Sequence, residues 1–437
     1  MPAYSMRFRV PEVVPSSIAR NRFFWVPDSS PDSFVATLLP NYRALGPRLG
    51  ALGPVREANV ELVRLAVLVF AADRSTPRKV GAANWSRREL SIEVPVVDPT
   101  RWEPIRDRMA NLLGFLSGDL WTITFRRTRA PKETVRENPF PEATRAVLLS
   151  GGADSAVGAL LSRQELGDDQ QVLVSHVGLT TLAPLQRDIG HRIETLVNGP
   201  VQPHQQIHLS RHSKQVGGAR FRDEPSSRTR SLLFLALGLA VASMNDVPLL
   251  IPENGFATLN PPLTPDQRGS LSTRTTHPLF LEQLAELAIA AGAHAVIENP
   301  LAAMTKGEMF TRVVDLVGQA EASRFLSATY SCSHTGHRSF KLSLLLQCGV
   351  CFGCLLRRAA FLASGVKDRT RYLSALQTGR PDAYLQSKSM EASLHSFVSR
   401  GLRATDLASM TLPPSYGTAT ARRLCEQAIS EMRLLFP

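Results

Sequence analysis

The sequence predicts an α/β protein with a doubly wound parallel sheet, preceded by a separate unit of helices and strands. Beyond about residue 144, short apolar runs alternate with segments of helical spacing, an order typical of parallel strands that are connected by helices. The first apolar run ends in a Gly-Gly turn, and four of the five cysteines lie between positions 332 and 354. These two features mark where the chemistry of the fold is expected.

The core elements are expected in alternating strand and helix order, with short apolar strands that are buried on both faces. The longest apolar run, Leu232–Ala242, lies in one of the predicted helices. A helix that spans a bilayer needs about 20 apolar residues, so this run predicts a buried helix and no membrane segment. The expected strands cover 146–149, 171–177, 206–209, 248–252 and 295–298, and the expected helices cover 156–163, 185–197, 231–244 and 279–291.

Three regions are expected, because a chain of 437 residues is too long for one ordinary core. Residues 1–138 are predicted to form an α+β domain without an assigned role, since they contain no catalytic motif. A proline-rich, charged stretch over 127–142 leads into the second domain, residues 139–370, which holds the sheet and the cysteines. Residues 371–437 are predicted to form a mainly helical extension.

The net charge of +12 is the main compositional bias. It suits a protein that handles phosphates, nucleotides or nucleic acid, and a basic solvated surface explains it equally well. Basic residues are spread along the chain, with local enrichment only over 211–230. Charge alone therefore does not favour nucleic acid as a partner, and it does not exclude it. The start of the chain shows no apolar leader segment, which predicts a cytoplasmic protein.

A phosphate-binding loop is predicted between the first strand and the first helix of the sheet. Its two glycines let the backbone turn sharply and bring N–H groups towards an anion, while the following helix contributes the partial positive charge of its N-terminus. Two serine hydroxyls add further donors. A plain helix cap is the competing explanation, and the complete motif favours the anion site. The loop consists of Ser150, Gly151, Gly152, Ala153, Asp154 and Ser155.

A metal site is predicted from the clustered cysteines. Cys348, Cys351 and Cys354 follow one another at Cys-x-x-Cys-x-x-Cys spacing, and Cys332 lies a short distance upstream. Four thiolates close a tetrahedral Zn²⁺ site that has no open coordination position. Such a site stabilises a fold and does not activate water.

The sequence leaves the identity of the metal and of its fourth ligand open. The cysteines fit an iron–sulfur cluster, a redox pair or unligated thiols less simply than zinc, and His334 and His337 compete with the upstream cysteine as fourth ligand. Cys425 stands alone and is expected in a helix core. The metal is expected to fix the segment that carries Arg357 and Arg358.

The loop motif resembles the PP-loop of the ATP pyrophosphatase superfamily, whose members cleave ATP between the α- and β-phosphates, adenylate a substrate oxygen and release pyrophosphate. Together with the cysteine motif, it resembles the 7-cyano-7-deazaguanine synthases, the QueC-type family. Four further stretches are similar to motifs of that family and occur in the same order, within a resemblance that covers about residues 144–365. These stretches are Arg230–Leu235, Asn299–Leu301, Thr305–Glu308 and Cys354–Arg357.

This resemblance implies an ATP-dependent C–N ligase that adenylates 7-carboxy-7-deazaguanine and combines it with an amine to give an amide and then a nitrile. Arg230 and Lys306 would neutralise charge on the ATP phosphates. Glu308 would orient the lysine or start a helix. Asp154 would help to position Mg²⁺, although helix capping explains this residue equally well. The implied cofactors are ATP, Mg²⁺ and Zn²⁺.

Several departures separate the chain from an ordinary member of the family. Residues 175–181 replace the family's Asp-Tyr-Gly-Gln segment, residues 254–277 differ where the substrate is expected, and the cysteine motif has a longer first gap. The additional terminal regions make the chain resemble the QatC-type proteins of anti-phage operons, which implies protein partners. The nucleophile is then either ammonia or an amine of a partner protein. Modification of tRNA by PP-loop chemistry also fits the motifs, and so does a non-catalytic scaffold.

Overall fold

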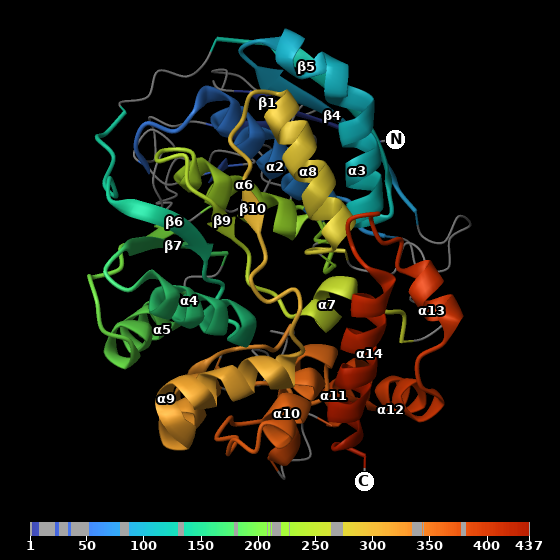
Figure 1. The fold of residues 1–437 in the computed structure, drawn as a ribbon. Helices are drawn as coiled ribbons and strands as arrows, with labels where there is room; N and C mark the ends of the chain where they lie inside the picture. Colours follow the sequence, from blue (N-terminus) through green and yellow to red (C-terminus); the bar gives the residue numbers. More distant parts are fainter. Residues whose placement is uncertain are drawn as a thin grey trace.

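The computed structural model of the chain contains two five-stranded sheets with helices between and around them (Figure 1). These elements lie within the residues that the structure describes. Those residues are 2–7, 22–25, 34–35, 52–78, 87–129, 135–178, 182–207, 209, 211, 220–226, 228–263, 274–333, 343, 345–376 and 382–436.

The second sheet is parallel throughout and confirms the predicted doubly wound core. Its strand order is β10-β9-β6-β7-β8, so the chain begins in the middle, adds two strands on one side and then crosses to the other. Helices α4 (Ala153–Leu166) and α5 (Leu182–Leu196) cover one face, and α6 (Arg230–Ala242) covers the other (Figure 1). The strands are β6 (Ala143–Leu148), β7 (Gln170–His176), β8 (His204–Ile207), β9 (Leu249–Leu250) and β10 (Ile297–Glu298).

The change of direction after β6 determines where a ligand is expected. In an open parallel sheet the connections on either side of such a switch point diverge, and they leave a crevice outside the carboxyl ends of the strands. Strand β6 lies between β7 and β9, so the turn that follows Leu148 opens into this crevice. The predicted phosphate loop is this turn.

The first sheet belongs to the N-terminal region, and its strands pair mainly in parallel. The order is β3-β2-β1-β4-β5, and β3 is its antiparallel strand. The extra unit expected as α+β is thus present and organised as α/β, with α3 (Arg106–Ser117) connecting β4 to β5. The strands are β1 (Ala3–Arg7), β2 (Arg22–Trp25), β3 (Phe34–Val35), β4 (Glu89–Val96) and β5 (Leu120–Arg127).

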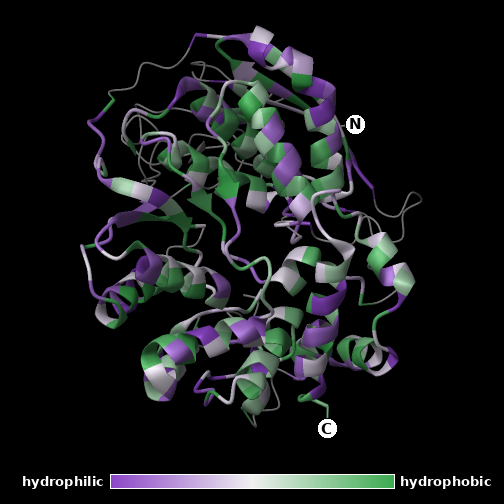
Figure 2. Ribbon diagram, viewed as in Figure 1, coloured by the Kyte–Doolittle hydropathy of each residue, from purple (hydrophilic) through white to green (hydrophobic). Residues whose placement is uncertain are grey.

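Helix α2 (Glu57–Ser75) joins the two sheets into one core. It packs on β4 with one side and on α6 with the other, and for this reason its sequence is apolar around most of its circumference. Figure 2 shows the hydrophobic residues gathered on the strands and on the helices between the sheets. A single apolar cluster runs from the first sheet through α2, α6 and α8 (Pro278–Ala290) to the second sheet. The N-terminal region is therefore a layer of the same body.

The described part of the C-terminal region is mainly helical. Helix α14 packs against α7 and α10 and shares an apolar cluster with α12 and α13. None of the helices in the described part of the chain is long and apolar enough to cross a membrane. The remaining helices are α7 (Gly255–Leu259), α9 (Lys306–Ala328), α10 (Phe352–Ala363), α11 (Asp382–Lys388), α12 (Glu391–Arg400), α13 (Ala404–Ser409) and α14 (Thr418–Arg433).

Candidate active site

The turn between β6 and α4 is closed by its two serines. The Ser155 hydroxyl accepts a hydrogen bond from Ser150 N at 3.1 Å and donates to Gly152 O at 3.1 Å. Ser150 Oγ in turn accepts a bond from Gly152 N at 3.2 Å. Gly151 has a φ of +91°, a region that L side chains rarely adopt, so the glycine is needed for this turn. The loop therefore presents a tight backbone curve at the N-terminus of a helix, as an anion site requires.

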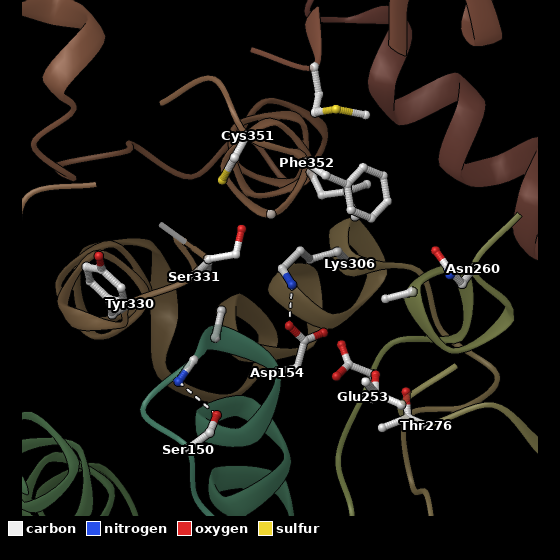
Figure 3. Close-up of a pocket in the computed structure, with 18 of the residues that line it drawn as sticks. Ser150, Asp154, Glu253, Asn260, Thr276, Lys306, Tyr330, Ser331, Cys351 and Phe352 are labelled. Carbon is white, nitrogen blue, oxygen red and sulfur yellow. Dashed lines mark hydrogen bonds and ion pairs between the residues drawn. The ribbon is translucent and has the colours of Figure 1, made fainter. Parts of the chain in front are cut away.

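A cavity of about 810 Å³ opens in front of the loop. Figure 3 shows side chains from distant parts of the chain facing one another across it. The phosphate loop forms one wall, the segment after β9 a second, and the start of α10 together with residues 387–390 a third. Its polar lining includes Ser150, Asp154, Ser155, Glu253, Asn260, Thr275, Thr276, Lys306, Tyr330, Ser331, Cys351 and Lys388.

Asp154 and Lys306 form an ion pair at the floor of this cavity (Figure 3). The second carboxylate oxygen of Asp154 accepts hydrogen bonds from Asn254 Nδ2 at 2.7 Å and Asn254 N at 3.2 Å. Burial opposes ionisation of Asp154, but the Lys306 charge and the bonds from both neighbours outweigh it and lower the pKa of the carboxyl. The sequence left helix capping open for Asp154, and the contacts of its carboxylate are to Lys306 and Asn254.

Lys306 is the first residue of α9, and the start of this helix is fixed from two directions. Thr305 and Glu308 form a capping box, with Thr305 N donating to Glu308 Oε2 at 2.7 Å. Glu308 thus starts the helix, one of the two roles considered for it. Glu431 of α14 accepts bonds from Gly307 N at 3.0 Å and from the Thr305 hydroxyl. The C-terminal extension therefore helps to hold the lysine in the cavity.

Glu253 is a cavity residue that the sequence reasoning missed. It follows β9 at the carboxyl edge of the sheet and lies beside Asp154 (Figure 3). Burial and then the negative charge of Asp154 raise the pKa of Glu253 to about 8, and Lys306 opposes this shift only in part. Its position directly after a buried strand was the one signal that pointed to it, since no motif marks the residue.

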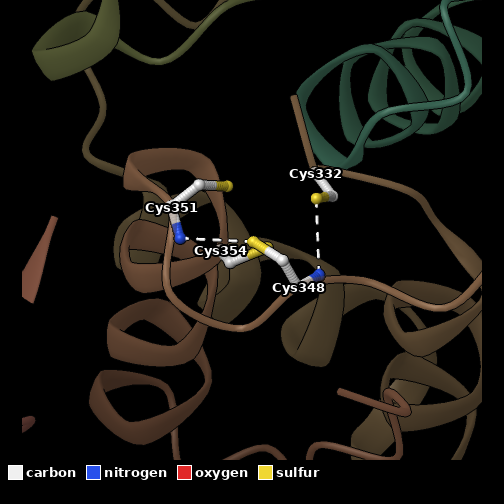
Figure 4. A group of neighbouring side chains, drawn as sticks. All are labelled: Cys332, Cys348, Cys351 and Cys354. Atoms are coloured by element: carbon white, nitrogen blue, oxygen red, sulfur yellow. Dashed lines mark hydrogen bonds between the residues drawn. The ribbon is translucent and has the colours of Figure 1, made fainter. Parts of the chain in front are cut away.

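The four cysteines meet as predicted. Their sulfur atoms all lie within 4.8 Å of one another and all four residues are buried (Figure 4). Four thiolates around Zn²⁺ at about 2.3 Å place neighbouring sulfurs about 3.8 Å apart. The sulfurs of Cys348 and Cys354 are 3.8 Å apart, and the amides of Cys348 and Cys351 donate to neighbouring sulfurs at 3.4 and 3.3 Å. The donor set therefore fits a structural zinc ion.

The structure places three of the other residues that were named with the metal site. Arg357 is fully buried and donates to Thr329 Oγ1 at 2.6 Å, so it braces the segment that the cysteines hold. Arg358 is bound to the Gly349 carbonyl at 3.1 Å. Cys425 lies in the apolar cluster of α14, as expected. His334 and His337 lie outside the described residues.

Comparison with known proteins finds several similar sequences. No family model matches the chain. The 7-cyano-7-deazaguanine synthase of Cupriavidus taiwanensis is 28% identical over 249 residues, which cover 52% of this chain and 97% of that protein. The synthase of Novosphingobium aromaticivorans is 28% identical over 254 residues, with 54% and 97% covered. That of Methanocaldococcus jannaschii is 38% identical over 80 residues, with 18% and 31% covered.

The chain is a relative of the 7-cyano-7-deazaguanine synthases. This relationship indicates an ATP-dependent, ligase-type enzyme of the PP-loop group. The match spans nearly the whole of several of these relatives but only about half of the QueC-like chain. The rest of the chain is additional to these relatives.

Arg230 of the QueC-like protein lies apart from the other proposed phosphate contacts. It is exposed on the first turn of α6, with its guanidinium carbon 4.8 Å from the centre of the Phe234 ring. It is not among the residues that line the cavity. The structure therefore brings Lys306 and Asp154 together with the loop and leaves Arg230 outside.

The segment that departs from the synthase motif is partly described. Ser175 donates to the Leu149 carbonyl, and His176 Nε2 lies 2.7 Å from the Leu209 carbonyl. Both side chains are thus occupied within the fold at the carboxyl end of β7. Residues 179–181 and 264–273, which form part of the two altered segments, lie outside the described residues.

Proposed function

We propose that this chain uses ATP to adenylate the carboxylate of a 7-carboxy-7-deazaguanine-like acid, releases pyrophosphate, and passes the acyl group to an amine. The observation that carries the proposal is the Asp154–Lys306 ion pair, which lies at the phosphate loop inside the cavity. Lys306 is only 6% exposed, and a buried ammonium beside an anion loop suits a polyphosphate. The relatives are named as synthases of a deazaguanine nitrile, which supports the substrate class.

In the first half-reaction negative charge builds up on the leaving pyrophosphate, and the cavity contains groups that can stabilise this charge. The substrate carboxylate attacks the α-phosphate, and the pyrophosphate that leaves gains negative charge. Backbone amides of the loop, the N-terminus of α4 and the Ser150 hydroxyl would bind the leaving group, and Lys306 would turn from Asp154 to the phosphates. Asp154 would hold Mg²⁺, which would supply positive charge to the phosphates. Arg230 is proposed as an outer cation with a smaller effect, because it lies outside the cavity.

The second half-reaction requires an amine. With ammonia the product is the amide, and a second ATP converts it to the nitrile. An amine of a partner protein would instead join the deazapurine to that partner. The additional half of the chain favours this second acceptor, since relatives named for the nitrile match only about half of its length. By its resemblance to QatC-type proteins, we propose a cytoplasmic role in anti-phage defence with partners from the same operon.

An assay of pyrophosphate release tests the adenylation. The purified chain with ATP, Mg²⁺ and 7-carboxy-7-deazaguanine is expected to release pyrophosphate and, with ammonium present, AMP. The control is 7-deazaguanine, which lacks the carboxylate and should release none. Absence of pyrophosphate with this acid and with related carboxylates would contradict the proposal. A salt-sensitive shift of tRNA mobility would instead favour tRNA modification.

Intact-mass measurement distinguishes the two acceptors. Partner proteins from the operon are incubated with the enzyme, ATP and the acid. A mass increase equal to the acyl group is expected on one partner if its amine is the acceptor. A small-molecule amide or nitrile with unmodified partners would assign ammonia as the acceptor.

A further inference from the structure

Glu253 is the carboxylate of the cavity wall to which the adenylation step gives no task. Its main chain is fixed by Asn299, whose side-chain oxygen accepts from Glu253 N at 3.2 Å and whose side-chain nitrogen donates to Glu253 O at 2.9 Å. Both residues follow neighbouring strands at the carboxyl edge of the sheet. The backbone is thereby held so that the Glu253 carboxyl faces the cavity beside Asp154 (Figure 3).

The groups around Glu253 include more carboxyls than ammonium groups. Lys306 is paired with Asp154, whose other oxygen is occupied by Asn254. Glu253 thus adds a second carboxyl beside one ammonium, and burial together with the Asp154 charge raises its pKa. A carboxyl in this state exchanges a proton close to neutral pH, which a base in catalysis needs. The other titratable groups that face the cavity are Lys388 from α11, Tyr330 after α9 and the Cys351 thiol before α10.

We infer that Glu253 is the general base of the second half-reaction and takes a proton from the amine that attacks the acyl-adenylate. The inference rests on the proposed function. Lys306 and the loop mark where the phosphates bind, so the acyl carbon attached to the α-phosphate lies close to this wall. Most amines are ammonium ions at neutral pH and have no lone pair with which to attack. A carboxylate at this position both attracts the ammonium and removes its proton.

The ammonium gives one proton to the Glu253 carboxylate, and the nitrogen lone pair forms the C–N bond to the acyl carbon. The bond from that carbon to the AMP oxygen breaks, and its electron pair leaves with AMP. The second proton of the nitrogen passes to the departing phosphate. Glu253 then returns its proton to water, and the products are the amide and AMP.

The test separates the two half-reactions in the Glu253→Gln variant. Carboxylate-dependent exchange of pyrophosphate into ATP reports adenylation and is expected to stay within about threefold. Amide formation from ammonium at pH 8, where Glu253 is substantially ionised, is expected to fall about 100- to 10,000-fold, the usual contribution of a general base. Hydroxylamine is unprotonated at this pH and needs no base, so hydroxamate formation is expected to stay within about threefold. Glu253→Asp should recover part of the ammonium reaction.

The matched control is Glu298→Gln, which removes an exposed carboxylate at the end of β10, the strand beside β9. It should leave both half-reactions unchanged. Equal losses of exchange and amide formation in Glu253→Gln would overturn the inference, because Glu253 would then act in adenylation, for example as a Mg²⁺ ligand. Unchanged amide formation from ammonium would overturn it as well. Absence of exchange in the unaltered chain would overturn the proposed function, and this inference with it.

Discussion

Two buried clusters border the cavity, the Asp154–Lys306 pair and, through Cys351, the four cysteines, and they differ in whether they are complete. The thiols form a closed set with the spacing of one metal ion. The ion pair borders a cavity and has a second carboxyl, Glu253, next to it. The amide of Tyr330 donates to the Gly151 carbonyl at 2.8 Å and so ties the cysteine segment to the loop. We therefore propose that the cysteines hold the scaffold and that the ion pair exchanges its partners for a ligand.

Disruption of the four cysteines, the closed cluster, is expected to cause the larger loss of stability and activity. Removal of the metal by a chelator, or the Cys354→Ala variant, is expected to abolish cooperative unfolding of the C-terminal half and all pyrophosphate release. Structural zinc contributes on the order of 10 kcal/mol to the folding of small domains. Metal analysis and thermal unfolding of the same preparation provide the measurement, with about one zinc per unaltered chain.

Cys425→Ala is the matched control for this prediction. Cys425 is buried in the apolar cluster of α14 and belongs to no group of ligands in the described part of the chain. Its loss should cost about 1 kcal/mol of stability and no metal. A chain that keeps its metal without Cys354, or binds none at all, would contradict the assignment of a structural centre.

Variants of the open cluster, which is the Asp154–Lys306 pair with Glu253 beside it, should lose activity before they lose their fold. Lys306→Met leaves the Asp154 carboxylate buried without its cation, which typically costs about 3–5 kcal/mol, and it should reduce pyrophosphate release at least about 100-fold. The double variant Asp154→Asn with Lys306→Met removes both charges. It is expected to regain most of the stability and none of the activity.

A pair with only a structural role would give a different result. In that case the double variant would recover activity together with stability. Chemical denaturation and the pyrophosphate assay on the two single variants and the double variant complete this thermodynamic cycle.

The phosphate loop and the four cysteines were predictable from sequence because each is marked by local spacing. The loop needs Gly151 at a positive φ and serines on either side, and the thiols need tight turns between successive ligands. Both requirements act over a few residues and therefore leave a motif. The parallel sheet was predictable for a similar reason, because apolar strands and helices alternate along the chain.

The surroundings of the clusters were not predictable, because they depend on contacts between distant segments. Glu431 accepts a hydrogen bond from Gly307 N, 124 positions away in the sequence, and no motif near either residue predicts this contact. Helix α2 is apolar around most of its circumference, but its sequence does not reveal that it faces the first sheet on one side and α6 on the other. Arg230 matches a family motif, yet the described conformation leaves it outside the cavity.

Glu431 allows the dependence of the open cluster on the C-terminal extension to be measured. Glu431→Ala removes the acceptor for Gly307 N and the Thr305 hydroxyl at the start of α9. The expected cost is about 2 kcal/mol, the scale of hydrogen bonds to a charged group, with a severalfold loss of pyrophosphate release through Lys306. Glu431→Gln keeps an acceptor oxygen and should recover part of both.

Glu426→Ala is the control on the same helix, since the Glu426 side chain is 57% exposed. Stability and activity should both remain unchanged in that variant. A loss of stability in Glu431→Ala without any change in activity would show that α14 supports the fold and does not position the lysine.

A pH dependence of stability is expected from the open cluster, through Glu253. The pKa of Glu253 rises from 4.5 to about 8 on folding, so between these values the unfolded chain binds fewer protons at this position than the folded chain. Stability from this group therefore falls as pH rises through the window and is constant above it. Glu253→Gln removes this loss and should raise the thermal midpoint by a few degrees at pH 9 and hardly at pH 5. Glu298→Gln should show no such trend, because that carboxyl is exposed. An equal shift of the thermal midpoint of Glu253→Gln at both pH values would contradict the prediction, because Glu253 would then be ionised in the folded chain at both.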